Sequence, residues 1–248
     1  VMRRDVEKAV QGFAHPAPSP DIASLKGLRG IIAARLSGSW IERPQVTLTT
    51  EADATSLVEM RKQIQEEWGV KVSYNAFLVK LAAKALKEFP YMNSQLTPAG
   101  IKIQPEINIG LAVDTERGLM VPVVRRADKK SLYEINEDLQ GLAQRAADGR
   151  SLPDELSGGT FTITNLGVFE IDAFTPIVNP PECAILGVGR IVSKPVGLNG
   201  QVVLREMMGL SLSFDHRLVD GAPAARFLQR IKTLIERCSL MGLERQGG

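Results

Sequence analysis

The residues best suited to chemistry lie in the segment DHRLVDG, residues 215–221, which holds one of the two histidines of the chain. The apolar run MMGLSLSF leads into this segment, and the amphipathic pattern APAARFLQRIKTLIE follows it. A histidine between the end of a strand and the start of a helix is held rigidly, as a general base at the rim of a pocket must be. The other histidine, His15, lies in a Pro/Ala stretch, so we expect any imidazole chemistry to come from His216.

The charged neighbours of His216 allow a structural and a functional interpretation. Asp215 and Arg217 flank the ring, and we expect them to lock the turn. Asp220 follows four residues after the histidine, but the turn and Gly221 intervene, so the two are not a metal-binding pair on one helix. A lone histidine is more often structural than catalytic. The strand-end position, Asp220 and Gly221 are the features that favour catalysis here.

A hydroxyl at a second strand end, that of Thr164, is the next candidate. It lies in the strand-like run GGTFTITNLG, residues 158–167. Threonine is a common strand residue and Asn-Leu-Gly a common turn, and composition alone favours this structural interpretation. The functional interpretation is that Thr164 donates a hydrogen bond into the site of His216.

Other nucleophiles and metal sites find little support. The chain has no GxSxG motif, which argues against a serine hydrolase of that type. Cys183 has apolar neighbours and should be buried and inert. Neither Cys183 nor Cys238 has ligand partners at zinc-site spacing, so we expect no metal. Two cysteines are too few for a disulfide framework, which favours a reducing compartment.

The overall composition is that of a soluble globular protein. Apolar residues make up 44% and charged residues 23% of the 248 residues, and the formal net charge is +2. This charge gives no electrostatic reason to expect a nucleic acid or an anionic membrane as partner. No apolar run approaches the ~20 residues of a membrane-spanning helix.

The composition divides the chain into three segments. Residues 1–10 can form a short helix, residues 11–20 have the alternating Pro and small residues of an extended linker, and residues 21–248 are globular. Ala/Pro tethers of this kind join independently moving domains, so we expect a further domain upstream.

Helical and strand patterns of the globular segment predict its fold class. Apolar stripes predict helices over 28–40, 57–68, 77–89, 132–146 and 223–235. For the second helix we expect a cap at Asp53 or Ser56, with Ser56 and Glu59 at capping-box spacing. Strand patterns occur at 45–50, at three short runs between 101 and 124, and at GGTFTITNLG, ECAILGVGRIV, QVVLR and MMGLSLSF. Helical patterns cluster in the first half of the chain and strand patterns in the second. This order favours a two-layer α/β (α+β) fold with a mixed, largely antiparallel sheet.

Three sequence blocks together resemble a known family. These blocks are LRGIIAARL, then GGTFTITNLGVF followed by FTPIVNPPECAILGVGRI, and finally SFDHRLVDGAPAARFL. In this order and spacing they resemble the catalytic domain of the dihydrolipoamide acyltransferases of 2-oxo acid dehydrogenase complexes. The resemblance runs from about Leu25 to Glu236, and it implies the fold of chloramphenicol acetyltransferase.

The resemblance implies roles for the site residues. His216 would take the proton from the thiol of CoA or of dihydrolipoamide, and Thr164 would stabilise the oxyanion formed when the thiolate attacks the acyl carbonyl. Asp220 would support the architecture of the site, with Arg35 as its ion-pair partner. Transfer would be direct, without an acyl-enzyme or a metal. The acyl group would be acetyl first, branched-chain second and succinyl third.

The resemblance also implies partners and a location. Family members form homotrimers with the active sites at subunit interfaces, and the trimers assemble into 24-mer or 60-mer cores. The lipoyl group would be carried on an upstream lipoyl domain. RRDVEKAV resembles the end of the peripheral-subunit-binding domain, which holds the 2-oxo acid dehydrogenase and dihydrolipoamide dehydrogenase components. The location would be the bacterial or archaeal cytoplasm, or the mitochondrial matrix.

Two features depart from the family pattern. The family tends to end in a short leucine-rich tail, whereas this chain ends in SLMGLERQGG. Glu170 lies where a glycine is frequent. Two alternatives to the acyltransferase remain: a non-catalytic core or binding subunit of such a complex, and a stand-alone CoA-dependent acetyltransferase acting on a small alcohol.

Overall fold

The computed structural model of the chain describes residues 27–116 and 118–238, without the side chains of Leu28 and Trp68. The predicted binding-domain end at 1–10, the linker at 11–20 and the C-terminal tail from Ser239 onward lie outside the described residues.

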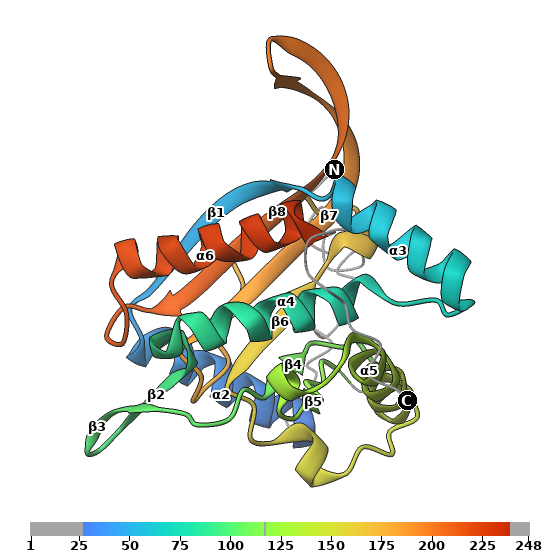
Figure 1. Cartoon of the computed structure of the whole chain (residues 1–248). Helices are drawn as coiled ribbons and strands as arrows, with labels where there is room; N and C mark the ends of the chain where they lie inside the picture. The colour runs from blue at the N-terminus through green and yellow to red at the C-terminus, as the bar shows by residue number, and fades with distance from the viewer. Residues whose placement is uncertain (1–26, 117, 239–248) are drawn as a thin grey trace, which may run out of the picture.

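Five α-helices and eight strands build the described part (Figure 1). The helices are α2 (Gly27–Glu42), α3 (Thr55–Trp68), α4 (Tyr74–Glu88), α5 (Leu132–Ala147) and α6 (Gly221–Glu236). The strands are β1 (Gln45–Asp53), β2 (Ser94–Thr97), β3 (Gly100–Ile103), β4 (Ile109–Leu111), β5 (Val123–Val124), β6 (Phe161–Asn165), β7 (Ala184–Leu198) and β8 (Gln201–Asp215). Short 3-10 turns occur at η1 (Pro90–Asn93), η2 (Ala127–Lys129), η3 (Pro153–Leu156) and η4 (Gly167–Phe169). None of these helices is long and apolar enough to cross a membrane.

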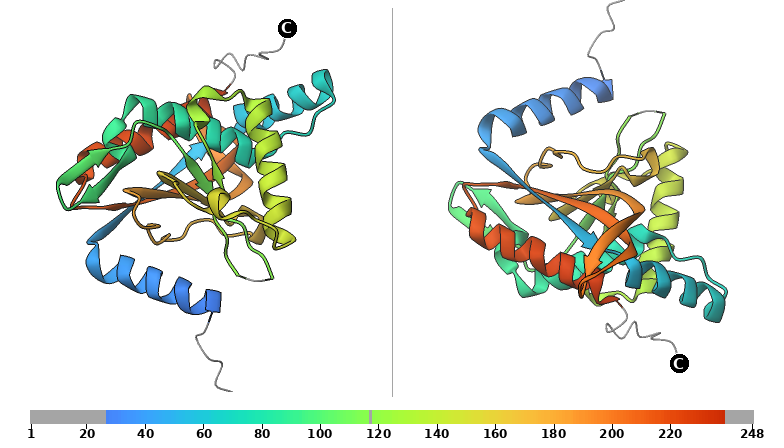
Figure 2. Two further views of the ribbon diagram at one scale, coloured as in Figure 1. Left: turned by 90° about the horizontal axis from the view of Figure 1, so that it is seen from below. Right: turned by 90° about the horizontal axis from the view of Figure 1, so that it is seen from above.

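The central sheet has six strands in the order β1-β8-β7-β6-β4-β5, and β2 and β3 form a separate ribbon. Three of its five strand pairs are antiparallel, and the β7/β6 and β6/β4 pairs are parallel. The helices α3, α4, α5 and α6 lie on one side of the sheet, whereas α2 lies on the opposite side (Figure 2). The predicted two-layer fold with a mixed, largely antiparallel sheet is confirmed.

The main core lies between the sheet and the α4/α6 layer. Phe161 of β6 and Phe89 both meet Phe227 of α6 edge to face, with ring centroids 5.8 and 5.9 Å apart. Phe161 and Phe227 are fully buried, and burying an aromatic side chain contributes about 1.5–3 kcal/mol. The predicted inward stripe of α6 is buried along its length: Phe227, Leu228, Ile231, Leu234 and Ile235.

Helix α2 differs from the other helices because much of its apolar surface stays exposed. Ile31, Trp40 and Ile41 are all exposed, although the first two belong to the predicted stripe. The helix is attached near its C-terminal end, where the Ser39 hydroxyl donates to the Val178 carbonyl at 2.6 Å. The stripe therefore predicted the helix but not its burial within one chain.

Two local expectations are wrong. The runs QVVLR and MMGLSLSF belong to one strand, β8, which pairs with β7 in a hairpin that extends beyond the sheet (Figure 1). The capping box at Ser56 is absent, because α3 begins at Thr55 after Ala54 and Ser56 lies inside the helix. Asp53 does contribute, since its Oδ1 accepts a hydrogen bond from the Thr55 N–H at 3.0 Å.

The segment after η4 crosses the sheet closely and explains one departure from the family pattern. Glu170 has a φ of 60°, in the left-handed region where glycine is least strained. Ile171 then accepts a hydrogen bond from the Arg190 N–H at 2.7 Å, where β7 departs from regular pairing between Val188 and Ile191. A Cβ atom at Gly189 would overlap the Asp172 carbonyl oxygen.

We expect Gly189→Ala to lower the free energy of unfolding by about 1–3 kcal/mol, because backbone atoms must move to admit the methyl group. Gly197→Ala is the matched control, since a Cβ there, on the same strand, has no atom within 4 Å. The control should change stability by no more than about 0.5 kcal/mol. Urea or thermal unfolding of the two variants measures the difference, and equal stabilities would contradict the close crossing of residues 171–172.

Candidate active site

The turn that carries His216 connects β8 to α6, as the sequence predicted. The strand ends at Asp215 and the helix begins at Gly221. The His216 N–H donates to the Pro44 carbonyl at 2.9 Å, and the Leu218 N–H donates to the Asp215 carbonyl at 3.0 Å. The imidazole therefore projects from a backbone that is hydrogen-bonded on both sides.

The carboxylate of Asp215 locks this turn. It has no exposed surface, and it accepts from the Arg217 N–H and Nε at 3.0 Å and from Arg217 Nη2 at 2.7 Å. Arg43 Nη1 lies 3.6 Å away and adds a second cation. The bond to Asp215 raises the pKa of Arg217 above its ordinary value. These contacts support the predicted role of Asp215 and Arg217 in locking the turn.

Asp220 lies beside the imidazole at the start of α6. Its Oδ1 is 3.9 Å from His216 Nδ1, which is too long for a hydrogen bond but close enough for an electrostatic interaction. The two side chains expose 41% and 85% of their surface, so both are accessible to a partner.

Thr164 lies at the end of β6 on the wall of a largely apolar hollow of about 380 Å³. One side of this hollow comes from α2 and the other from strand residues such as Thr162 and Ile185. The turn after Thr164 is fixed by Asn165, whose Oδ1 accepts from the Gly167 N–H at 2.9 Å and whose Nδ2 donates to Asn75 Oδ1 at 2.8 Å. Thr164 therefore lies on the wall of a largely apolar hollow, next to a turn that is fixed by hydrogen bonds.

One chain does not bring Thr164 and His216 together. Thr164 pairs with Gly187, and Gly187 pairs with Ser211, so His216 is two strands away and five residues further along. At about 3.3 Å per residue and 4.8 Å between strands, this separation is roughly 19 Å. His216 is also absent from the lining of the Thr164 hollow.

The ion pair expected between Arg35 and Asp220 is not formed within the chain. Arg35 lines the Thr164 hollow from α2, and its Nη2 donates to the Pro180 carbonyl. Asp220 lies beside His216. Within one chain, Arg35 thus lies beside the Thr164 hollow and Asp220 beside His216, and the pairing of the two stays a prediction.

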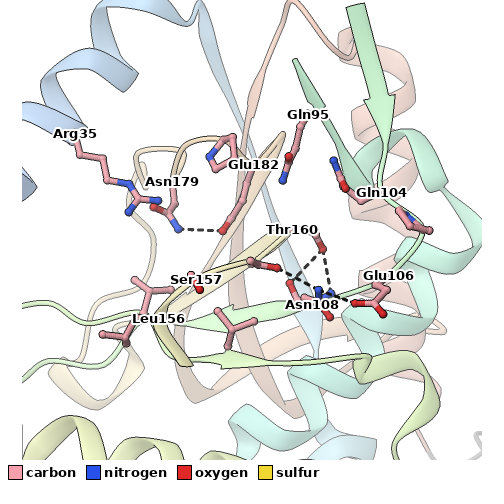
Figure 3. A pocket seen from close by; sticks show the side chains of 16 residues that line it. Arg35, Gln95, Gln104, Glu106, Asn108, Leu156, Ser157, Thr160, Asn179 and Glu182 are labelled. Carbon is pink, nitrogen blue, oxygen red and sulfur yellow. Dashed lines mark hydrogen bonds between the residues drawn. The ribbon is translucent and has the colours of Figure 1, made fainter. Parts of the chain in front are cut away.

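Sequence reasoning missed a buried polar cluster around Glu182 (Figure 3). Glu182 Oε2 accepts from the Thr162 hydroxyl at 2.6 Å, and Oε1 accepts from Asn179 Nδ2 at 3.0 Å. The carboxyl is almost fully buried, and this burial raises its pKa to about 7. Asn-Pro-Pro-Glu before an apolar strand was the available signal, because a charged residue inside such a run needs partners.

A second, more polar hollow of about 340 Å³ adjoins the Thr164 hollow. Glu182 and Asn108 are among its lining residues, whereas four residues line both hollows: Arg35, Val121, Leu156 and Asn179. Glu182 therefore lies behind the boundary between the two hollows.

Both cysteines are buried, which the sequence predicted for Cys183. Burial raises the pKa of Cys183 to about 12 and that of Cys238 to about 11, so neither thiol is a nucleophile near neutral pH. Within residues 27–116 and 118–238, no group of three His, Cys, Asp or Glu side chains could hold a metal ion.

Comparison with known proteins gives consistent matches. Residues 18–243 match the family model of the 2-oxoacid dehydrogenases acyltransferase (catalytic domain). The chain is 41% identical over 240 residues to the dihydrolipoyllysine-residue acetyltransferase component of the pyruvate dehydrogenase complex of Bacillus subtilis, covering 93% of this chain and 54% of that protein. The chain thus spans about half the length of the curated relatives it matches.

Two solved structures are similar over nearly their whole length. One is the Azotobacter vinelandii dihydrolipoamide acetyltransferase (TM-score 0.83, 39% identity, 90% of this chain and 97% of that chain), from work on a serine, a histidine and an asparagine in its catalytic mechanism. In that protein the serine precedes the histidine by 52 positions, and the asparagine follows it by four. The other is the cubic core of a pyruvate dehydrogenase multienzyme complex, with the same TM-score, identity and coverage.

A chloramphenicol acetyltransferase, at 13% identity and a TM-score of 0.51, shares the fold alone, which confirms the predicted fold. The family model covers most of the chain, and the relatives match it over the same region. The chain belongs to the family of 2-oxoacid dehydrogenase acyltransferases and contains their catalytic domain.

Proposed function

We propose that this protein transfers an acetyl group between the dihydrolipoamide of a lipoyl domain and CoA, within a 2-oxo acid dehydrogenase complex. The observation that carries the proposal is a spacing. Thr164 precedes His216 by 52 positions and Asp220 follows His216 by four, the separations of the serine, histidine and asparagine of the A. vinelandii enzyme. Threonine keeps the hydroxyl of serine, whereas Asp220 replaces the amide of asparagine with a carboxylate.

The chemistry needs a base and an oxyanion donor. A thiol with a pKa near ~8.5 is mostly protonated at neutral pH, so the basic nitrogen of His216 removes its proton. The thiolate then attacks the carbonyl carbon of the thioester, and the carbonyl oxygen becomes an oxyanion that accepts a hydrogen bond from the Thr164 hydroxyl. When the tetrahedral intermediate collapses, the new thioester remains, and the leaving sulfur takes the proton back from His216.

Self-association follows from the separation of the two groups. Because one chain leaves His216 and Thr164 roughly 19 Å apart, each site must combine the histidine of one chain with the threonine of another. The exposed apolar residues of α2, next to the Thr164 hollow, support a subunit contact there. We propose a homotrimer, and the likeness to a cubic core supports its further assembly into a 24-mer.

The remaining partners rest on the family. A lipoyl group on an upstream lipoyl domain would deliver the acetyl group, with CoA as the second substrate and no metal. The 2-oxo acid dehydrogenase and dihydrolipoamide dehydrogenase components would bind through the segment before the linker at 11–20. Relatives from Bacillus subtilis favour a bacterial cytoplasm over the mitochondrial matrix.

Removal of the Thr164 hydroxyl should slow acetyl transfer. We expect Thr164→Ala to lower kcat by about 10²–10³-fold, because one oxyanion donor is lost. Thr164→Ser keeps the hydroxyl and is the matched control, so its kcat should remain within several-fold of the wild type. His216→Ala should lose about 10²–10⁴-fold. The assay follows transfer from acetyl-CoA to free dihydrolipoamide; full activity of His216→Ala, or none in the wild type, would contradict the proposal.

Mixing two inactive variants tests the shared site. When His216→Ala and Thr164→Ala chains are unfolded, mixed in equal amounts and refolded together, about one quarter of the interfaces should combine an intact histidine with an intact threonine. Acetyl transfer should therefore recover to about one quarter of the wild-type rate. Each variant refolded alone serves as control. A site completed within one chain would give no recovery.

The acyl group can be identified by rates with acetyl-, isobutyryl-, isovaleryl- and succinyl-CoA. We expect acetyl-CoA to give the highest kcat/KM, with branched-chain groups next. Each added methylene changes binding by only about 1–3 kcal/mol, so differences of about 10- to 200-fold are expected. A higher kcat/KM for succinyl-CoA would overturn the acetyl assignment without affecting the roles of His216 and Thr164.

A further inference from the structure

The cluster around Glu182 fixes the orientation of an amide beside the Thr164 hollow. Asn179 Nδ2 donates to Glu182 Oε1 at 3.0 Å and lies 3.3 Å from Thr162 Oγ1. The Thr162 hydroxyl gives its own proton to Glu182 Oε2, at 2.6 Å, so its oxygen is free to accept from Asn179. Both N–H groups of the Asn179 amide are therefore occupied by the cluster.

This arrangement leaves the carbonyl oxygen of the amide facing outward. A carboxylate only accepts hydrogen bonds, so the ionised Glu182 requires the NH₂ end of Asn179 to face it. Within the part of the chain that the structure describes, no group donates a hydrogen bond to Asn179 Oδ1. Asn179 lines both hollows, at their boundary and beside the guanidinium of Arg35 (Figure 3), so Oδ1 is an acceptor at the edge of the space that a ligand would fill.

The acceptor lies close to the reacting centre. Thr162 and Thr164 are two residues apart on β6 and both line the apolar hollow, which puts them roughly 7 Å apart on the same face. Most of the other side chains of that hollow are apolar, so a hydrogen-bonding group at its edge can orient a flexible ligand. The arms that carry the two thiols, in CoA and in dihydrolipoamide, both contain amide N–H groups.

We propose that Asn179, held by Glu182, accepts a hydrogen bond from an amide N–H of the arm that carries the reacting thiol, and so sets the depth to which that arm enters. Asn179 is the residue that touches the arm, and Glu182 is a positioning residue that acts through it. This inference rests on the proposed acyl transfer.

The test separates binding from turnover in the assembled wild-type and variant proteins. For Asn179→Ala, we expect the KM of one arm to rise about 3- to 10-fold with kcat within about twofold, because one neutral hydrogen bond is lost. Measuring the KM of CoA and that of dihydrolipoamide separately identifies the arm. Glu182→Gln preserves the shape of the side chain but allows the Asn179 amide to adopt either orientation. When the two orientations are equally populated, half of the molecules can bind the arm, so the same KM should rise by about twofold.

Gln104→Ala is the matched control. Gln104 lines the polar hollow with an amide side chain but makes no side-chain hydrogen bond to Asn179 or Glu182. Its KM values should equal those of the wild type. Unchanged KM values for both arms in Asn179→Ala, or a fall in kcat alone, would overturn the inference. A wild type without acyl transfer would instead contradict the proposed function.

The pH dependence of the same KM provides a second measurement. Glu182 faces Arg35 from α2 and Arg43 from the segment after it, and Glu106 lies across the polar hollow. Burial raises the pKa of Glu182 to about 7, so the locked, ionised state prevails above that pH and is lost as the pH falls below it. The KM should therefore rise between pH 8 and pH 6 in the wild type, and this rise should be absent in Glu182→Gln. An identical rise in both proteins would contradict the role of Glu182.

Discussion

The buried carboxylate of Asp215 determines where the imidazole of His216 lies. It ends β8, accepts hydrogen bonds from the backbone and side chain of Arg217, and pairs with Arg43 from the segment before β1. The next residue, Pro44, accepts the backbone N–H of His216. A buried charge of this kind is tolerated only when paired, and removal of one partner costs about 3–5 kcal/mol. The turn, the end of β8 and the start of β1 therefore form one unit.

The strand order then keeps the two candidate groups, His216 and Thr164, far apart in one chain. One side packs against α4 and α6 and forms the core, whereas α2 and the hollow beside Thr164 lie on the other side. His216 follows the C-terminal end of β8, roughly 19 Å from Thr164. No small movement can therefore bring it to Thr164. Under the proposed function, this separation is the reason that acetyl transfer requires assembly. Helix α2 does not cover the main core of its own chain, and part of its apolar surface stays exposed. An exposed apolar surface of this kind is free to contact a second chain.

Local features of the sequence were predictive where the interacting residues are close along the chain. The lock between Asp215 and Arg217 spans two residues, and the apolar stripe of α6 repeats at helical spacing. The prediction of a capping box at Ser56 failed because α3 begins earlier, at Thr55, whose N–H donates to the carboxylate of Asp53. Glu182 was missed because Thr162, which is 20 residues away, contacts it only through the pairing of β6 with β7. No spacing rule encodes that contact, although the other partner, Asn179, lies in the same Asn-Pro-Pro-Glu run.

The sequence by itself determined the strand-end position of His216, the hydroxyl at Thr164, the fold class and the family, because each depends on short patterns of residue type. The tertiary structure alone decided that these two groups lie far apart in one chain, that Arg35 lies beside the Thr164 hollow and not beside Asp220, and that a buried carboxyl orients Asn179 at the hollow. These last features depend on strand order and register, which place residues far apart in sequence beside each other or keep them apart. Periodicity reports which face of an element is apolar, but not which neighbour that face meets.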